Sequence, residues 1–528
     1  MATVAVSSSR RFERLRASDA LLAGATLVVL VVLSAYVRTR AIGGSFWMDE
    51  GLSVGISSHA LTAIPGVLRQ DGSPPLYYLL LHEWMDVFGR SETAVHWLSL
   101  TASLLTIPAA MWAGWSLWSK RAGYVGAVLC ALMPFLTAYG EEARMYSLMA
   151  LLALLTSAFF LHAFVYRRRG YLPAFAVGLA LMVYTHSWGI FFGVGAFLAL
   201  GLLWWLAARE QRRALLIDGL LGFGAAVVLY LPWVPTVLYQ TAHTGAPWAN
   251  KPRFGVPVQI ARDVLGGFGP AVAVVLVAGF GIATLLAAKR ARGDRERLSV
   301  WVLLAIPIVT LGLAWLLSQI SPAWASRYFA AIVGPLVLLL ALGLARAGKL
   351  GLVALALACV FWVKPTQYVD GYKSDVRDIG AEVGAQMKPG DLVLVGQPEQ
   401  TPLVWYYMPA GLHYAQTIGA VSDPRYLDWA DALSKLEAAQ PERVLPPLLA
   451  KLRPGQKVLF VRPITDGVDN WRAPWTQLVR RRSAQWGAIL AGDPTLRQVQ
   501  VAPQFYRGAS TVGDSAALYE KTSSPQLP

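Results

Sequence analysis

Residues 19–37 read DALLAGATLVVLVVLSAYV, an apolar run of membrane length. An α-helix rises about 1.5 Å per residue, so this run matches the roughly 30 Å hydrocarbon core of a bilayer. Arg10, Arg11, Arg14 and Arg16 precede it, and no small-residue cleavage signal clearly follows it. The pattern predicts a retained signal anchor with a cytoplasmic N-terminus.

Similar runs recur along most of the chain. Of its 528 residues, 55% are hydrophobic and only 15% are charged, a composition too apolar for an ordinary soluble enzyme of this length. We therefore predict a multi-pass membrane protein with about eleven membrane-spanning helices. The predicted spans are 19–37, 92–118, 121–139, 145–166, 171–187, 188–207, 214–234, 270–288, 298–318, 328–345 and 349–363.

The basic residues gather in the short loops on one side of these spans. A net charge of +15 can indicate nucleic-acid binding, but this placement follows the positive-inside rule, so no nucleic-acid partner is predicted. The inner loops carry Lys120 and Arg121, Arg167 to Arg169, Arg209, Arg212 and Arg213, the basic residues of 289–297, and Arg346 and Lys349. Residues 38–91 and everything after Val363 then lie on the outer side.

One apolar segment, Pro74 to Phe88 (PPLYYLLLHEWMDVF), is not counted as a span. It is short and contains His82, Glu83 and Asp86, and counting it would turn the basic loops that follow outward. An interfacial helix within the long outer loop 38–91 fits it better.

The last part of the chain, residues 364–528, has a mixed polar composition. Asp391–Gly396 (DLVLVG) and Lys457–Arg462 (KVLFVR) are strand-like, with helical patterns between them. The predicted fold is thus an all-α polytopic membrane bundle, residues 1–363, followed by an extracytoplasmic soluble α/β domain.

Short polar segments lie at the predicted outer ends of the spans. They are Phe46-Trp47-Met48-Asp49-Glu50-Gly51, Asp71-Gly72-Ser73-Pro74-Pro75-Leu76-Tyr77-Tyr78, Gly140-Glu141-Glu142-Ala143-Arg144-Met145-Tyr146, Tyr184-Thr185-His186-Ser187-Trp188 and Ser326-Arg327-Tyr328. Each has an ordinary explanation by itself, because acids cap helices, arginines reach headgroups and aromatic residues form interfacial belts. Ionisable groups inside a bundle cost about 2.5–3.5 kcal/mol each, however, so their convergence on one side favours a site.

Asp49, Arg144 and Arg327 suit a reaction in which one substrate is carried by lipid. A carboxylate can take the proton of an incoming hydroxyl, and guanidinium groups match the oxygens of a lipid phosphate. No convincing P-loop or dinucleotide-binding glycine motif is present, so a nucleotide pocket is not evident. The residues predict an inverting sugar transfer from a polyprenyl phosphate.

The basic first span, the outer Asp49-Glu50 pair, the Pro-Pro-Leu-Tyr-Tyr segment and the turn with Arg144 together resemble the GT-C superfamily of membrane glycosyltransferases. Its family 39-like and aminoarabinose-transferase-like branches are most similar, and the resemblance is most specific over residues 40–190. It implies a polyprenyl-phosphate-sugar donor, with Asp49 as catalytic base, Glu50 completing the motif and Arg144 contacting the donor phosphate. Arg327 is expected to act similarly.

The resemblance also suggests roles for neighbouring side chains. Relatives often carry His or Lys before the Pro-Pro pair, whereas this chain has Ser73, and His82 is a second candidate for the phosphate. The other candidates are Tyr146 for the phosphate, Glu141 and Glu142 for motif or acceptor support, and Tyr77, Tyr78, His186 and Trp188 for sugar or lipid contacts. No cofactor is required, but some relatives hold a divalent metal, which Asp49, Glu142 and His186 could ligate here.

The leading hypothesis is a plasma-membrane enzyme that moves a mannose-like sugar or arabinose to a hydroxyl of a cell-envelope glycan, lipid or protein. A glycolipid transporter or flippase and a non-catalytic envelope-assembly protein are the alternatives. Transporters tend to place charges near the midplane and to contain repeated halves, and neither feature is evident in the sequence.

Overall fold

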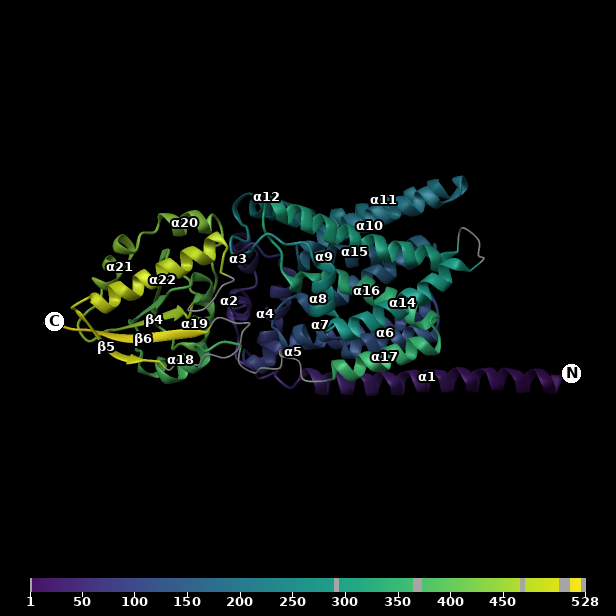
Figure 1. The fold of residues 1–528 in the computed structure, drawn as a ribbon, viewed down its shortest axis with the longest axis horizontal. Helices are drawn as coiled ribbons and strands as arrows, with labels where there is room; N and C mark the ends of the chain where they lie inside the picture. The colour runs from purple at the N-terminus through teal and green to yellow at the C-terminus, as the bar shows by residue number, and fades with distance from the viewer. Residues whose placement is uncertain (1, 289–293, 364–372, 466–470, 503–512, 524–528) are drawn as a thin grey trace.

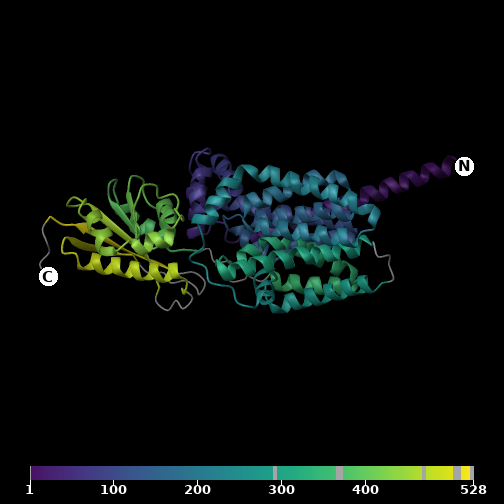
Figure 2. The same cartoon turned by 90° about the horizontal axis from the view of Figure 1, so that it is seen from above.

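The computed structural model describes residues 2–288, 294–363, 373–465, 471–502 and 513–523. Residues 289–293 of the predicted basic loop, and the predicted domain boundary at 364, lie outside the described residues. The described chain forms a long helical bundle and a smaller α/β domain, with short helices between them (Figures 1 and 2).

The bundle consists of apolar helices that run roughly side by side (Figure 1). They are α1 (Ala2–Arg38), α5 (Glu92–Leu117), α6 (Lys120–Leu132), α7 (Pro134–Ala138), α8 (Tyr146–Phe160), α9 (Leu172–Thr185), α10 (Trp188–Leu206), α11 (Arg209–Tyr230), α14 (Phe268–Ala287), α15 (Arg295–Ile320), α16 (Ala330–Arg346) and α17 (Lys349–Trp362). Among the described residues, eight helices are long and apolar enough to cross a membrane, and the bent pair α6 and α7 would make a ninth. All eleven predicted spans fall on helices, although α9 and α17 have only 14 residues each.

The centre of the bundle is formed by α8 and α16. About four-fifths of each apolar stretch is buried inside the protein, 83% for α8 and 78% for α16, whereas the figure for α1 is only 17%. Helices that are apolar all round belong either in a protein core or in lipid. Burial therefore separates the core helices from α1, which lies at the edge of the bundle (Figure 1).

Arg38 stabilises the bend between α6 and α7. Proline has no N–H, so Pro134 leaves the carbonyl of Cys130 without its usual helical donor. The Arg38 guanidinium replaces that donor: Nη2 lies 2.5 Å from the Cys130 oxygen and 3.2 Å from the Ala131 oxygen. Its Nη1 also donates to the Ser103 hydroxyl at 2.8 Å. This fixes the end of α1 where the chain enters the long loop.

A layer of short helices covers the end of the bundle that faces the α/β domain (Figures 1 and 2). Its members are α2 (Met48–Ser57), α3 (Ile64–Asp71), α4 (Leu76–Phe88) and α12 (Val234–His243). The predicted interfacial segment is α4, which is not among the helices long enough to span a membrane. Loop 38–91 and the α/β domain thus lie at the same end of the bundle.

The α/β domain contains a six-stranded sheet in the order β3-β2-β1-β4-β6-β5. The strands are β1 (Leu392–Val395), β2 (His413–Gln416), β3 (Gly419–Val421), β4 (Lys457–Pro463), β5 (Leu496–Val501) and β6 (Asp514–Lys521). The helices are α18 (Val376–Glu382), α19 (Thr401–Tyr407), α20 (Ala432–Ala438), α21 (Pro441–Leu449) and α22 (Pro474–Gly492). The two strand-like segments of the sequence are β1 and β4, which pair in parallel with Leu392 opposite Val458. Alternate side chains of β1 face two apolar layers, one with α21 and α22 and the other with α18 and α19.

Two glycines on α2 let it pack closely against the α/β domain. A Cβ at Gly51 would lie 2.6 Å from the Leu403 Cα of α19, and one at Gly55 would collide with the Arg425 carbonyl. Glycines four residues apart share a helix face, so their spacing allows backbones to approach. The orientation of α2, which begins with Met48 and Asp49, is therefore set by this domain.

Candidate active site

Asp49 lies in the first turn of α2, between two arginines from distant parts of the chain. Its Oδ2 is 3.9 Å from Arg144 Nε and 3.7 Å from Arg327 Nη2. The Asp49 side chain is 17% exposed, so it is accessible from the surface. The carboxylate and the two guanidinium groups predicted to act together therefore occupy one place at the end of the bundle.

Arg144 belongs to the turn before α8 and is almost fully buried. Its Nη1 donates to the Asp49 carbonyl oxygen and the Ser53 hydroxyl, both at 3.2 Å, and to the Tyr78 hydroxyl at 3.3 Å. These contacts orient the guanidinium from α2 and α4. Its Nε is buried and has no hydrogen-bond partner among the described residues.

Arg327 lies in the short helix η6 (Ser326–Phe329) at the start of α16. Its guanidinium carbon is 5.2 Å from the ring centre of Trp248 and 5.8 Å from that of Trp47. Cation–π contacts hold a cation without using its N–H groups. Within the described part of the chain its Nε, like that of Arg144, has no hydrogen-bond partner, which leaves donors for an anion.

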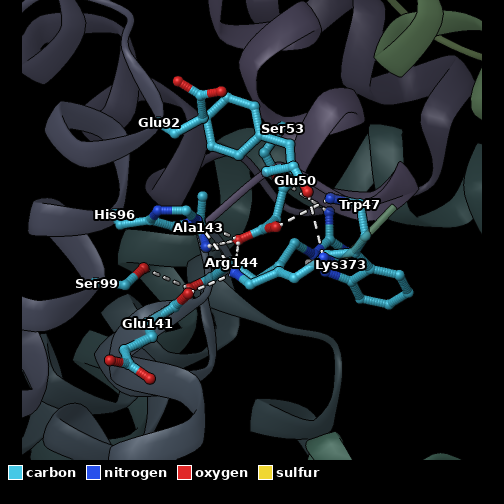
Figure 3. A network of polar contacts seen from close by, with 12 residues as sticks. Trp47, Glu50, Ser53, Glu92, His96, Ser99, Glu141, Ala143, Arg144 and Lys373 are labelled. Atoms are coloured by element: carbon cyan, nitrogen blue, oxygen red, sulfur yellow. Dashed lines mark hydrogen bonds and ion pairs between the residues drawn. The ribbon is translucent and has the colours of Figure 1, made fainter. Parts of the chain in front are cut away.

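Glu50 is next to Asp49 but has all its hydrogen bonds within the protein (Figure 3). Its Oε1 is 2.7 Å from His96 Nε2, 2.8 Å from Lys373 Nζ and 2.8 Å from the Ala143 N–H, and its Oε2 accepts the Trp47 N–H at 3.1 Å. Burial alone would raise the pKa of Glu50, but the charges and hydrogen bonds of Lys373 and His96 outweigh it and lower the pKa to about 2. Glu50 therefore acts as a structural anion that fixes the start of α2.

Lys373 and His96 are functional-site residues that the sequence prediction missed. Lys373 Nζ also donates to the Glu141 carbonyl at 2.6 Å, so it joins the beginning of the α/β domain to two segments of the site. His96 lies within α5, and a polar side chain inside a predicted span was the available signal. Lys373 carried no comparable signal, since it lies 323 residues from Glu50 in the chain.

Several predicted contact residues form an aromatic group beside the arginines. The Tyr146 ring centre is 6.2 Å from that of His186, and the Tyr328 ring centre is 4.6 Å from His186 and 5.5 Å from Trp188. Arg144 lies 6.0 Å from the Tyr146 ring centre, measured from its guanidinium carbon. Tyr146, His186 and Trp188 thus border the arginine pair.

Other predicted residues lie further from the carboxylate or serve the framework. His82 binds the Ser57 carbonyl oxygen through Nδ1 at 2.9 Å, and the Tyr77 hydroxyl, almost completely buried, pairs with that of Ser99 at 2.9 Å. Glu141 accepts the Ala41 N–H at 3.0 Å. The Ser73 carbonyl accepts from Gln240 at 3.4 Å.

Two carboxyl groups near Asp49 have unsatisfied oxygens. Among the residues that the structure describes, neither side-chain oxygen of Asp71 has a hydrogen-bond partner, and Oε1 of Glu142 has none either, although all three atoms are buried. Burial and the charge of Glu50 raise the pKa of Glu142 to about 8, against the opposing charges of Lys373 and Arg327. Buried polar groups are normally paired, so these oxygens indicate a place for a ligand.

The proposed metal ligands Asp49, Glu142 and His186 do not form a metal site. Within the described residues, no group of three or more His, Cys, Asp or Glu side chains is arranged to hold a metal ion. The Asp49 carboxylate instead faces two guanidinium groups. Two positive charges beside this carboxylate disfavour a divalent cation there.

Comparisons with known proteins address the fold. No protein family matches this sequence, and no curated protein matches it in sequence. The structure of ArnT from Cupriavidus metallidurans bound to undecaprenyl phosphate is similar, with a TM-score of 0.62 and 14% identity, over 95% of this chain and 99% of that one.

Two further solved structures are similar over 94% of this chain. The archaeal oligosaccharyltransferase AglB from Archaeoglobus fulgidus, in complex with an inhibitory peptide and a dolichol-phosphate, has a TM-score of 0.54, 11% identity and 74% of its length covered. The arabinofuranosyltransferase AftD from Mycobacteria has a TM-score of 0.51, 16% identity and 40% of its length covered. The chain thus shares the fold of these three structures, as its resemblance to the GT-C superfamily predicted.

Proposed function

We propose that this protein is an inverting glycosyltransferase that moves a sugar from a polyprenyl-phosphate donor to a hydroxyl of a cell-envelope glycan, lipid or protein. The sugar is mannose-like or arabinose. The reaction takes place on the outer face of the plasma membrane, with the N-terminus in the cytoplasm and the α/β domain outside. Support for this orientation comes from the basic inner loops.

The observation that carries the proposal is the place of Asp49 between Arg144 and Arg327. A general base and an anion-binding pair at one boundary between the bundle and the α/β domain match a reaction between a lipid phosphate and a water-soluble hydroxyl. Neighbours of the same fold support the donor class, since one is bound to undecaprenyl phosphate and another to a dolichol-phosphate.

The reaction follows from these groups. Asp49 takes the proton of the acceptor hydroxyl as its oxygen forms a bond to the anomeric carbon. The bond between that carbon and the phosphate oxygen breaks on the opposite face, and the polyprenyl phosphate leaves with the electron pair. Arg144 and Arg327 stabilise the charge that develops on the phosphate. Attack from the opposite face inverts the anomeric centre.

A donor-consumption assay tests the proposal. The full-length protein in lipid nanodiscs is supplied with polyprenyl-phosphate mannose or arabinose and an envelope acceptor fraction, and release of polyprenyl phosphate is followed by mass spectrometry. We expect one donor to be consumed. Asp49→Asn should lower turnover by roughly 10²- to 10⁴-fold, the usual contribution of a general base, while the melting temperature and donor binding are kept.

Two outcomes would contradict the proposal. The protein is a flippase if the wild type transfers no sugar and Asp49→Asn moves labelled glycolipid between leaflets as well as the wild type does. A protein that neither consumes a donor nor moves lipid, with Asp49→Asn indistinguishable from wild type in envelope assembly, identifies a scaffold.

A further inference from the structure

Asp71 carries a buried carboxyl group beside the proposed active site. This group has no role in the proposed reaction. Asp71 is the last residue of α3 and only 6% exposed. Among the described residues neither of its oxygens has a hydrogen-bond partner, although the hydroxyl and backbone N–H of Ser73, two residues on, lie near enough to oppose the rise of its pKa. Buried polar groups are normally paired, so an unsatisfied buried carboxyl needs an explanation.

The charges that act on Asp71 are those of the site. Burial raises the pKa of Asp71 to about 6, contacts with Ser73 and the charge of Arg144 oppose this rise, and the charge of Asp49 adds to it. Tyr78, whose hydroxyl accepts from Arg144, also feels the charge of Asp71. Asp71 therefore approaches the Asp49–Arg144 pair from the α3–α4 side.

The segment that carries Asp71 is clamped from several directions. Gly72 takes a φ of +99°, which favours glycine, and its N–H bonds to the Leu68 carbonyl at 2.9 Å. Gln240 on α12 donates to the same carbonyl at 2.8 Å. From the α/β domain, the Trp429 N–H donates to the Gln70 carbonyl at 3.0 Å. The carboxyl is thus held in place by contacts that leave its own oxygens free.

Glu142 is a second carboxyl that feels the charges of the site, those of Asp49 and Arg327 among them. Its Oε1 is likewise buried and unpaired. Asp71, with both oxygens unpaired among the described residues and close to a base and two arginines, calls for a ligand with hydrogen-bond donors. The hydroxyl groups of a sugar ring supply such donors.

We propose that Asp71 is a sugar-binding residue that accepts a hydrogen bond from a ring hydroxyl of the donor sugar. The inference rests on the proposed function, because it places the sugar of the polyprenyl-phosphate donor. It assigns the α3–α4 turn to sugar specificity, and the arginines to the phosphate.

The test combines Asp71→Asn with donors that lack one hydroxyl at a time. Full-length wild type, Asp71→Asn and the control Glu83→Gln, an exposed carboxylate on α4, are each assayed with the parent polyprenyl-phosphate sugar and its monodeoxy analogues. One deoxy analogue should slow the wild type by roughly 10- to 100-fold, the range for a hydrogen bond to a charged group. Asp71→Asn should slow the parent donor and discriminate less between it and that analogue, because an amide oxygen accepts a weaker hydrogen bond than a carboxylate. Glu83→Gln should behave as wild type.

The outcomes separate the two proposals. If the wild type consumes no polyprenyl-phosphate sugar, the proposed function itself is wrong. If the wild type turns over but Asp71→Asn discriminates between the donors as the wild type does, only the role of Asp71 is overturned. A wild-type preference for an amino group in place of the hydroxyl would also overturn it. Asp71→Glu is measured in parallel, and loss of folding in both variants would identify a structural carboxyl.

Discussion

Asp49 and Glu50 are adjacent in the chain, yet their surroundings differ completely. Glu50 is fully buried and accepts hydrogen bonds from His96, Lys373 and two backbone N–H groups. Asp49 is partly exposed and lies more than 3.5 Å from the guanidinium nitrogens that face it. A carboxylate with every hydrogen bond made holds structure, whereas one loosely surrounded by cations can still exchange partners with a substrate.

The largest expected effect on stability is that of Glu50→Gln. The equivalent change at the neighbouring acid, Asp49→Asn, should leave the fold intact. Glu50→Gln leaves the partly buried Lys373 without its anion, and removing one partner of a buried ion pair typically costs about 3–5 kcal/mol. Chemical unfolding in detergent, followed by tryptophan fluorescence, should show this loss for Glu50→Gln and almost none for Asp49→Asn. Equal losses for both variants would remove the distinction between the two acids.

A smaller effect should follow from filling the glycine face of α2. Gly55→Val places a side chain against the Arg425 carbonyl of the α/β domain, and overpacking of this kind costs about 1–3 kcal/mol. Because α2 positions Asp49, turnover should fall as well as the unfolding midpoint. Gly66, which has open space around it, provides the matched control Gly66→Val. A loss as large at Gly66 would show that the contact with the α/β domain is not the cause.

The pH dependence of stability should separate Glu50 from Glu142. The pKa of Glu50 is lowered to about 2 from an ordinary value near 4.5, so its stabilisation is complete above pH 4.5 and is lost as the pH falls toward 2. The pKa of Glu142 is raised to about 8, so Glu142 lowers stability progressively as the pH rises from about 4.5 to 8. Melting temperatures are measured from pH 3 to 9. In Glu50→Gln the fall in melting temperature below pH 4.5 should disappear, and in Glu142→Gln the fall between about pH 4.5 and 8 should become smaller. Unchanged slopes in these variants would contradict both assignments.

The sequence predicted the membrane bundle well because apolar length and loop charge are local signals. Residues 38–91 and the α/β domain were predicted to lie at one end of the bundle, and Asp49, Arg144 and Arg327 were predicted to form one site. It could not predict that Glu50 would be a buried structural anion, since that depends on Lys373 and His96 from remote segments. The strand order β3-β2-β1-β4-β6-β5 depends on nonlocal pairing that no local pattern encodes. Asp71 was visible in its motif, but its unpaired oxygens appear only in three dimensions.

Lys373 has a consequence for exchanging parts between proteins of this architecture. It is the first described residue after the bundle, and its ammonium group reaches Glu50 and the Glu141 carbonyl. The α/β domain therefore cannot be exchanged without regard to this contact with the bundle. A chimera that joins this bundle to a foreign α/β domain after residue 373 keeps the ion pair between Lys373 and Glu50. If the junction lies before residue 373, the foreign domain must supply a lysine that reaches Glu50.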